Sequence, residues 1–261
     1  MGILNCTPDS FFSDSRVGSD RELLLAAENM LQDGATFLDL GGQSTRPGAT
    51  QVSVEEELLR VIPAIKAVLR VFPNALISVD TFYAEVAKQA ILEGAVMVND
   101  VSAGEEDPQL FELMGKLKVP YVLMHSKGRI PALPGKAIYD NLMLDIIQFF
   151  AAKLRMLIDL GLADVILDPG FGFGKSLQQN YALLYQLNQL KILELPVLVG
   201  VSRKSMIQKL LGTTAAESLN GTSSLHMLAL ERGAKILRVH DVKEANHCIQ
   251  IFNFAKNSVK S

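Results

Sequence analysis

A short apolar run, residues 165–167, leads to Asp168 and then to the segment PGFGFGKS. Such a run, bounded by turn residues, predicts a buried strand. Pro169 predicts that the strand ends there, because proline has no amide hydrogen for a strand ladder. The alternating glycines let main-chain amides approach a ligand closely. The segment therefore predicts a carboxylate at the end of a strand, followed by a ligand-binding loop.

Two nucleotide-binding motifs fail on spacing in this loop. A Walker A loop has four residues between its first glycine and Gly-Lys-Ser, whereas three residues lie between Gly170 and Gly174. The dinucleotide fingerprint needs a glycine where Lys175 stands. Taken by itself, this segment could also be a simple connecting loop. The same arrangement of an apolar strand with a polar end recurs along the whole chain, which argues against that alternative.

Length and composition narrow the class of protein. The chain has 261 residues, 49% of them hydrophobic and 20% charged, with a net charge of −3. An α/β barrel of about 250 residues often forms a single domain. The net charge argues against a nucleic-acid partner. No uninterrupted apolar stretch reaches the roughly 18 residues of a membrane span, so we expect no membrane partner.

The cysteines and the amino terminus indicate the compartment. Cys6 and Cys248 are far apart, and neither has metal-ligand spacing around it. Isolated cysteines are typical of a reducing compartment. The first residues become polar too soon for a signal peptide. We therefore expect a cytoplasmic protein.

Eight apolar runs recur along the chain, and each ends near polar residues. Helical patterns follow them, notably at residues 20–31, 54–71, 141–160 and 242–255. Alternating strands and helices predict a parallel sheet. Eight such units in a chain of this length predict an α/β fold of the (β/α)8 TIM-barrel type, with residues 1–261 forming one domain. The predicted strands are residues 2–5, 36–40, 75–79, 96–98, 121–124, 165–167, 197–200 and 235–239.

In such barrels the active site lies at the carboxyl ends of the strands. The carboxylates and amide of Asp80, Asn99 and Asp168 suit the amino and lactam edges of a planar heterocycle. Basic side chains suit phosphate oxygens, which arginine binds in a bidentate way. The residues alone therefore indicate a barrel enzyme acting on a phosphorylated heterocycle. The strand-end polar residues are Asn5, Thr45, Arg46, Asp80, Asn99, His125, Asp168, Lys204, Arg238 and His240.

Seven segments, distributed in order over nearly the whole chain, resemble the dihydropteroate synthase family. The resemblance implies condensation of 6-hydroxymethyl-7,8-dihydropterin diphosphate with p-aminobenzoate, which gives 7,8-dihydropteroate and pyrophosphate. It also implies a magnesium ion and a homodimer. The segments are GILNCTPDSF at residue 2, GGQSTRPG at 41, SVDT at 78, NDVS at 99, DPGFGFGK at 168, SRKS at 202 and RVHD at 238.

The resemblance also implies roles for single residues. The pterin would be held by Asp80, Asn99, Met124, Asp168, Phe173 and Lys204. The diphosphate would be held by Asn5, Thr45, Arg46, Arg238 and His240, with Asn5 also binding the metal. The p-aminobenzoate pocket would be formed by Thr45, Arg46, Pro47, Phe173 and Ser205. Lys204, Asp168 and Arg238 would be catalytic, in a displacement in which diphosphate leaves early and the amine captures a pterin cation.

Some features depart from the family pattern, and two other functions remain open. Gln43 stands where the family usually has glutamate, and a longer first loop leaves the role of Asp14 open. A related barrel transfers a methyl group from a folate to a corrinoid protein, but it would not need the STRPG loop or the RVH segment. The other alternative is a barrel that binds pterin without catalysis.

Overall fold

The structure is a computed structural model that describes residues 1–6, 16–43, 51–127 and 137–258, with only the backbone of 16–20. Within these ranges, no helix is both long enough and apolar enough to pass through a membrane.

Six strands form one parallel sheet in sequence order, and two more strands pair separately. The isolated bridges Leu167–Val197 and Gly2–Val239 connect the two groups, so that the eight strands form a ring. Backbone hydrogen bonds of 2.9 Å support both joints, from Leu167 N to Pro196 O and from Ile3 N to Val239 O. The predicted TIM barrel is therefore confirmed. The strands are β1 (Gly2–Asn5), β2 (Phe37–Gly41), β3 (Leu76–Asp80), β4 (Met97–Asp100), β5 (Tyr121–Met124), β6 (Val165–Asp168), β7 (Leu198–Val199) and β8 (Ile236–Leu237).

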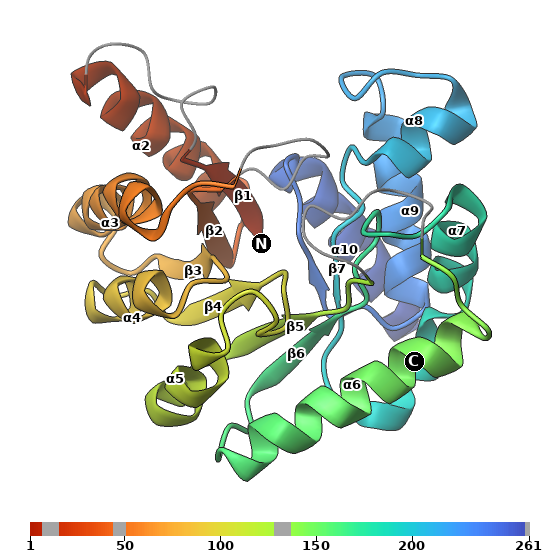
Figure 1. Cartoon of the computed structure of the whole chain (residues 1–261). Coiled ribbons are helices and arrows are strands. Elements are labelled where there is room, and N and C mark those ends of the chain that lie inside the picture. Colours follow the sequence, from red (N-terminus) through yellow and green to blue (C-terminus); the bar gives the residue numbers. More distant parts are fainter. Residues whose placement is uncertain (7–15, 44–50, 128–136, 259–261) are drawn as a thin grey trace.

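The helices surround the strands (Figure 1). Side-chain caps fix where several of them begin: Ser53 caps α3, Asn141 caps α6, and Ser176 forms a capping box at α7. The helices are α2 (Arg16–Gln32), α3 (Val54–Val71), α4 (Ala84–Leu92), α5 (Gln109–Leu117), α6 (Leu142–Asp159), α7 (Leu177–Tyr185), α8 (Ser205–Leu211), α9 (Leu219–Glu231) and α10 (Val242–Ser258), with the 3-10 helix η1 (Leu187–Leu193) after α7.

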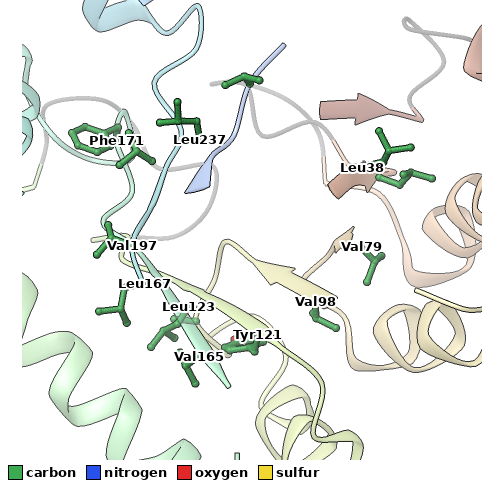
Figure 2. Close-up of a cluster of buried hydrophobic side chains, with 14 of the residues drawn as sticks. Leu38, Val79, Val98, Tyr121, Leu123, Val165, Leu167, Phe171, Val197 and Leu237 are labelled. Atoms are coloured by element: carbon green, nitrogen blue, oxygen red, sulfur yellow. The ribbon is translucent and has the colours of Figure 1, made fainter. Parts of the chain in front are cut away.

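Strand alternation separates two apolar layers. Because successive strand side chains point to opposite faces, one set faces the helices and the other faces the barrel interior. The outer set belongs to the largest buried cluster, and Figure 2 shows members of it from around the barrel, including Leu38, Val79 and Leu123. A smaller cluster contains the inner set at the amino-terminal end: Met1, Phe37, Met97, Val122, Ile166, Leu198 and Ile236.

This inner apolar layer positions the functional layer above it. Two residues further along the chain from six of its members stand Asp39, Asn99, Met124 and Asp168 within their strands, and Gly200 and Arg238 directly after β7 and β8. A step of two residues returns a side chain to the same face of a strand. These residues therefore share the interior face at the carboxyl ends of the strands.

The structure corrects several predicted boundaries. The helix predicted over 20–31 begins at Arg16 and ends at Gln32. The last two strands are shorter than the predicted 197–200 and 235–239, since regular pairing covers only Leu198–Val199 and Ile236–Leu237. Arg238 and His240 consequently lie beyond β8 rather than within it.

Candidate active site

The strand register aligns several of the predicted site residues at the carboxyl end of the barrel. Asn5 pairs with Gly41, Gly41 with Asp80, and Asp80 with Asn99. On the next strands Met124 pairs with Asp168. The end of the barrel therefore carries two amides, two carboxylates and a thioether.

Arg238 connects the carboxylates of two strands. Its Nε donates to Asp39 Oδ2 and its Nη2 to Asp80 Oδ2, each at 2.6 Å. Asn99 Nδ2 donates to the same Asp39 oxygen at 3.0 Å. Burial raises the pKa of the Asp80 carboxyl, and the Arg238 guanidinium opposes that shift. The four side chains form one buried polar network that fixes the direction of each donor and acceptor.

Asp39 is the central acceptor of this network, and the sequence analysis missed it. Its side chain is fully buried, and Oδ1 has no hydrogen-bond partner among the described residues. Asp39 lies inside the apolar run that predicts strand 36–40, whereas the sequence indicates candidate site residues only at the strand ends. A charged residue within a buried strand was the available signal, because such a residue is rarely buried without a partner.

Asp168 begins the glycine loop that follows β6. Its Oδ1 accepts the amide hydrogen of Gly170 at 2.8 Å, in a turn that orients the carboxylate. Burial raises the pKa of Asp168, and the positive charge of Lys204 is the strongest influence that lowers it. Within the described ranges no hydrogen bond is made to the second carboxylate oxygen, so it can accept one from a ligand.

Lys204 lies on the other side of the same loop. Its Nζ donates to Phe171 O at 2.5 Å and lies 4.8 Å from the centroid of the Phe173 ring. Burial lowers the pKa of Lys204 to about 8, and Asp168 opposes the shift. The structure therefore brings Lys204, Asp168 and Phe173 together.

An apolar surface adjoins these charges. Met124 packs in a small buried cluster with Phe82 and Val101, and Phe173 lies against that cluster. An aromatic ring and a thioether next to carboxylates and a lysine can bind the face of a flat molecule while the charged groups bind its edge.

His240 follows the network residue Arg238 closely along the chain, and Ser205 follows Lys204. His240 Nδ1 is 3.1 Å from Ser202 Oγ, and Ser202 Oγ accepts the His240 amide at 3.2 Å. Burial and the Arg238 cation lower the pKa of His240 to about 4. Ser205 is exposed at the first turn of α8, directly after Lys204.

Some predicted site residues fall outside the described part of the chain. Thr45, Arg46 and Pro47 are among them, and so is Asp14. Gln43, which replaces the usual glutamate of the family, is described: its Oε1 accepts the amide hydrogen of Val52 at 2.8 Å. This bond joins the described stretches on either side of the segment 44–50.

The fold and this site define a class of protein: an enzyme with a (β/α)8 barrel that binds a small polar heterocycle at the carboxyl ends of its strands. Known proteins of similar sequence identify the family within this class. The profile of a family described as "Pterin binding enzyme" matches residues 1–240. The dihydropteroate synthase of Haemophilus influenzae is 39% identical over 260 residues, covering 99% of this chain and 94% of the relative. That of Escherichia coli is 41% identical over 253 residues, covering 96% and 89%.

Solved structures agree with these relatives. A dihydropteroate synthetase with a bound product superposes with a TM-score of 0.91 at 40% identity, covering 98% of this chain and 93% of that one. The Xanthomonas albilineans dihydropteroate synthase in complex with 7,8-dihydropteroate gives 0.87 at 35% identity, covering 98% and 92%. The chain belongs to the pterin-binding enzyme family, and within it to the dihydropteroate synthases. It is a transferase of folate biosynthesis.

Proposed function

We propose that the site described above joins 6-hydroxymethyl-7,8-dihydropterin diphosphate to p-aminobenzoate, releasing pyrophosphate. One observation carries the proposal: buried carboxylates and a lysine converge beside an apolar wall at the end of the barrel. The carboxylates of Asp80 and Asp168 accept hydrogen bonds from the amino and lactam N–H groups of the pterin. Asn99 and Lys204 contribute further polar contacts, while Met124 and Phe173 cover the faces of the ring.

The diphosphate is assigned to the residues at β1 and β8. Arg238 and His240 supply nitrogen donors, and Asn5 supplies an amide oxygen at the end of β1. Because Arg238 already bonds Asp39 and Asp80, it joins the pterin edge to the leaving group. Thr45 and Arg46 complete the diphosphate site in this proposal, although they lie outside the described residues.

A magnesium ion fits this arrangement with few protein ligands. Among the described residues no group of three or more His, Cys, Asp or Glu side chains could hold a metal. Magnesium is often held by one or two protein ligands, substrate phosphates and water. Asn5 would be the protein ligand here, and the ion would neutralise charge on the departing diphosphate.

The p-aminobenzoate pocket is assigned to Ser205, Phe173 and the segment containing Thr45, Arg46 and Pro47. A structural relative, the Xanthomonas albilineans enzyme solved with 4-aminobenzoic acid, is 38% identical with a TM-score of 0.90. It covers 98% of this chain and 92% of that one. Ser205 lies next to Lys204, so the second substrate is placed beside the pterin.

The proposed mechanism needs no general base. Diphosphate leaves the pterin methylene early, and the amine of p-aminobenzoate captures the resulting cation and then loses a proton to solvent. Lys204, Asp168 and Arg238 act by orienting the ring and by balancing the charge that develops as the bond breaks.

Asp168→Asn tests the pterin assignment. The amide oxygen of asparagine can keep the bond from Gly170 N, whereas the charge is lost. Hydrogen bonds to charged groups contribute about 1.5–3 kcal/mol, so we expect the dissociation constant for 6-hydroxymethylpterin to rise about 10- to 100-fold. Isothermal titration of the pterin measures this. Unchanged affinity would remove Asp168 from the pterin site.

The pKa of Lys204 predicts a pH limit on activity. Below about pH 8 Lys204 carries a charge, and above it the charge is lost, so kcat/KM for the pterin diphosphate should fall above about pH 8. Arginine stays charged, so Lys204→Arg should move this fall to higher pH.

Burial lowers the folded-state pKa of Lys204 below the value in the unfolded chain. Between these two pKa values the unfolded chain binds more protons, so this group makes the fold more stable as pH rises above about 8. Circular dichroism over the same range should therefore show a folded protein; the same alkaline fall in both enzymes would contradict the assignment.

We propose that the protein is a homodimer in the cytoplasm. Large apolar side chains are exposed on neighbouring elements: Tyr185 at the end of α7, Ile192 on η1, and Leu210 and Leu211 on α8, each more than half exposed. Patches of this kind often mark protein interfaces. Both cysteines are free and buried, which fits a reducing compartment.

A further inference from the structure

Lys175, the residue after the last glycine of the loop, is buried to an unusual degree. Its side chain is only 1% exposed. A lysine is almost never fully buried unless its ammonium has partners. The partners of Nζ are Gly170 O at 2.9 Å, His125 Nδ1 at 3.1 Å and Phe173 O at 3.4 Å, with His125 O at 3.5 Å. All of them are neutral acceptors.

These acceptors belong to two different strand ends. His125 follows β5, whereas Gly170 and Phe173 belong to the loop after β6. The His125 amide also donates to Asp168 O at 2.8 Å. The Lys175 ammonium therefore fastens the glycine loop to the neighbouring strand at the point where Asp168 leaves the sheet.

His125 is held in a defined state by this contact. Burial lowers the pKa of Lys175 to about 7; in its charged form the ammonium only donates, so that His125 Nδ1 accepts and the ring proton is on Nε2. The ring packs edge-on against Phe149, with centroids 4.8 Å apart. Burial and the Lys175 charge lower the pKa of His125 to about 2, so the ring stays neutral.

Two lysines divide the carbonyls of the loop between them. Lys175 takes those of Gly170 and Phe173, and Lys204 takes that of Phe171 at 2.5 Å. Asn180 holds the loop as well, because its Oδ1 accepts the Gly172 amide at 2.7 Å. The result is a fixed backbone path that presents the Phe173 ring to Lys204.

We propose that Lys175 is a positioning residue for the reaction: with His125 as its acceptor, it holds Phe173 and Asp168 where the pterin ring binds. This role rests on the proposed function, because it assigns the purpose of the same site. Lys175 touches no substrate, and it acts through the loop.

Lys175→Met tests the proposal, since methionine fills most of the same volume without the ammonium. We expect the variant to fold and its dissociation constant for 6-hydroxymethylpterin to rise about 10- to 100-fold, as a displaced binding group can cost that much. The dissociation constant for pyrophosphate with magnesium should stay unchanged, because Asn5 and His240 lie outside the loop.

Lys153→Met is the matched control. Lys153 is also mostly buried and also donates to a loop carbonyl, that of Ala103, at 3.0 Å. Removing its ammonium should lower the melting temperature and leave the pterin affinity unchanged. An equal loss of pterin affinity in both lysine variants, or no loss in either, would overturn the proposal.

Two variants of His125 supply a second test that does not depend on the folding of Lys175→Met. In His125→Asn the side-chain oxygen can stand near the position of Nδ1, so pterin affinity should be largely retained. His125→Leu has no acceptor and should lose affinity as Lys175→Met does. Equal affinities for the two His125 variants would contradict the proposed pairing.

Pyrophosphate release by the unaltered protein keeps the two claims apart. If that protein turns over both substrates but Lys175→Met binds pterin normally, the positioning role is wrong and the proposed function stands. If the unaltered protein releases no pyrophosphate, the proposed function fails, and the pterin titrations still decide whether Lys175 shapes the pocket.

Discussion

Replacing Arg238 with methionine is expected to destabilise the protein more than any other single change in the polar network. The substitution leaves Asp39 and Asp80 without their cation, and their side chains are 0% and 12% exposed. Removing one partner of a buried ion pair typically costs about 3–5 kcal/mol, because the remaining charge has no compensation. Urea denaturation at neutral pH would measure this loss of unfolding free energy.

The pH dependence of the Arg238 variant follows from the same cause. Burial already raises the folded-state pKa of Asp80, and without the guanidinium that opposes this shift the pKa rises further. The folded variant then binds more protons than the unfolded chain, so its stability increases as pH falls. The difference in stability between the variant and the parent should therefore be smaller at pH 5 than at pH 8.

Arg70→Met is the control for Arg238→Met. Arg70 is exposed in the last turn of α3, and surface substitutions of this kind usually change stability by less than about 0.5 kcal/mol. If the two arginine variants were equally stable, the ion-pair network around Asp39 would not contribute as its geometry indicates.

Gly170→Ala is the second change with a large expected effect. A Cβ at this position would lie 1.9 Å from His125 O, and the backbone φ is +69°. The left-handed conformation costs a residue with a side chain about 1–2 kcal/mol, and overpacking adds about 1–3 kcal/mol or more. We expect a loss of about 3 kcal/mol in unfolding free energy, measured by chemical denaturation, together with weaker pterin binding.

Gly212→Ala separates the two causes. Gly212 has a φ of +65°, and no described atom lies within 4 Å of its added Cβ. Gly212→Ala should therefore lower the unfolding free energy only by the cost of the left-handed backbone conformation, about 1–2 kcal/mol. Equal losses for Gly170→Ala and Gly212→Ala would show that the contact with His125 does not constrain the loop.

Most of the fold was predictable because each strand is a short apolar run that ends in polar residues. The strands and the flanking helices followed from that pattern, and Asp80, Asn99, Asp168 and Lys204 were predicted as site residues from their positions. The number of domains and the roles of single residues stay predictions.

Other parts of the site could not be read from local patterns. Asp39 could not be recognised as a site residue because it lies within a strand rather than at its end. Its partner Arg238 is 199 residues away in the sequence. The role of Lys175 depends on His125, 50 residues earlier, so spacing within the glycine loop gave no sign of it. Contacts between distant strand ends are set by barrel closure, which sequence periodicity does not specify.

Synthase activity is tested most directly by measuring pyrophosphate release when the purified protein is mixed with magnesium, 6-hydroxymethyl-7,8-dihydropterin diphosphate and p-aminobenzoate. We expect release in step with formation of 7,8-dihydropteroate, and loss of both when either organic substrate is omitted. Pterin binding without pyrophosphate release would contradict it, because the barrel would then be a binding protein rather than a synthase.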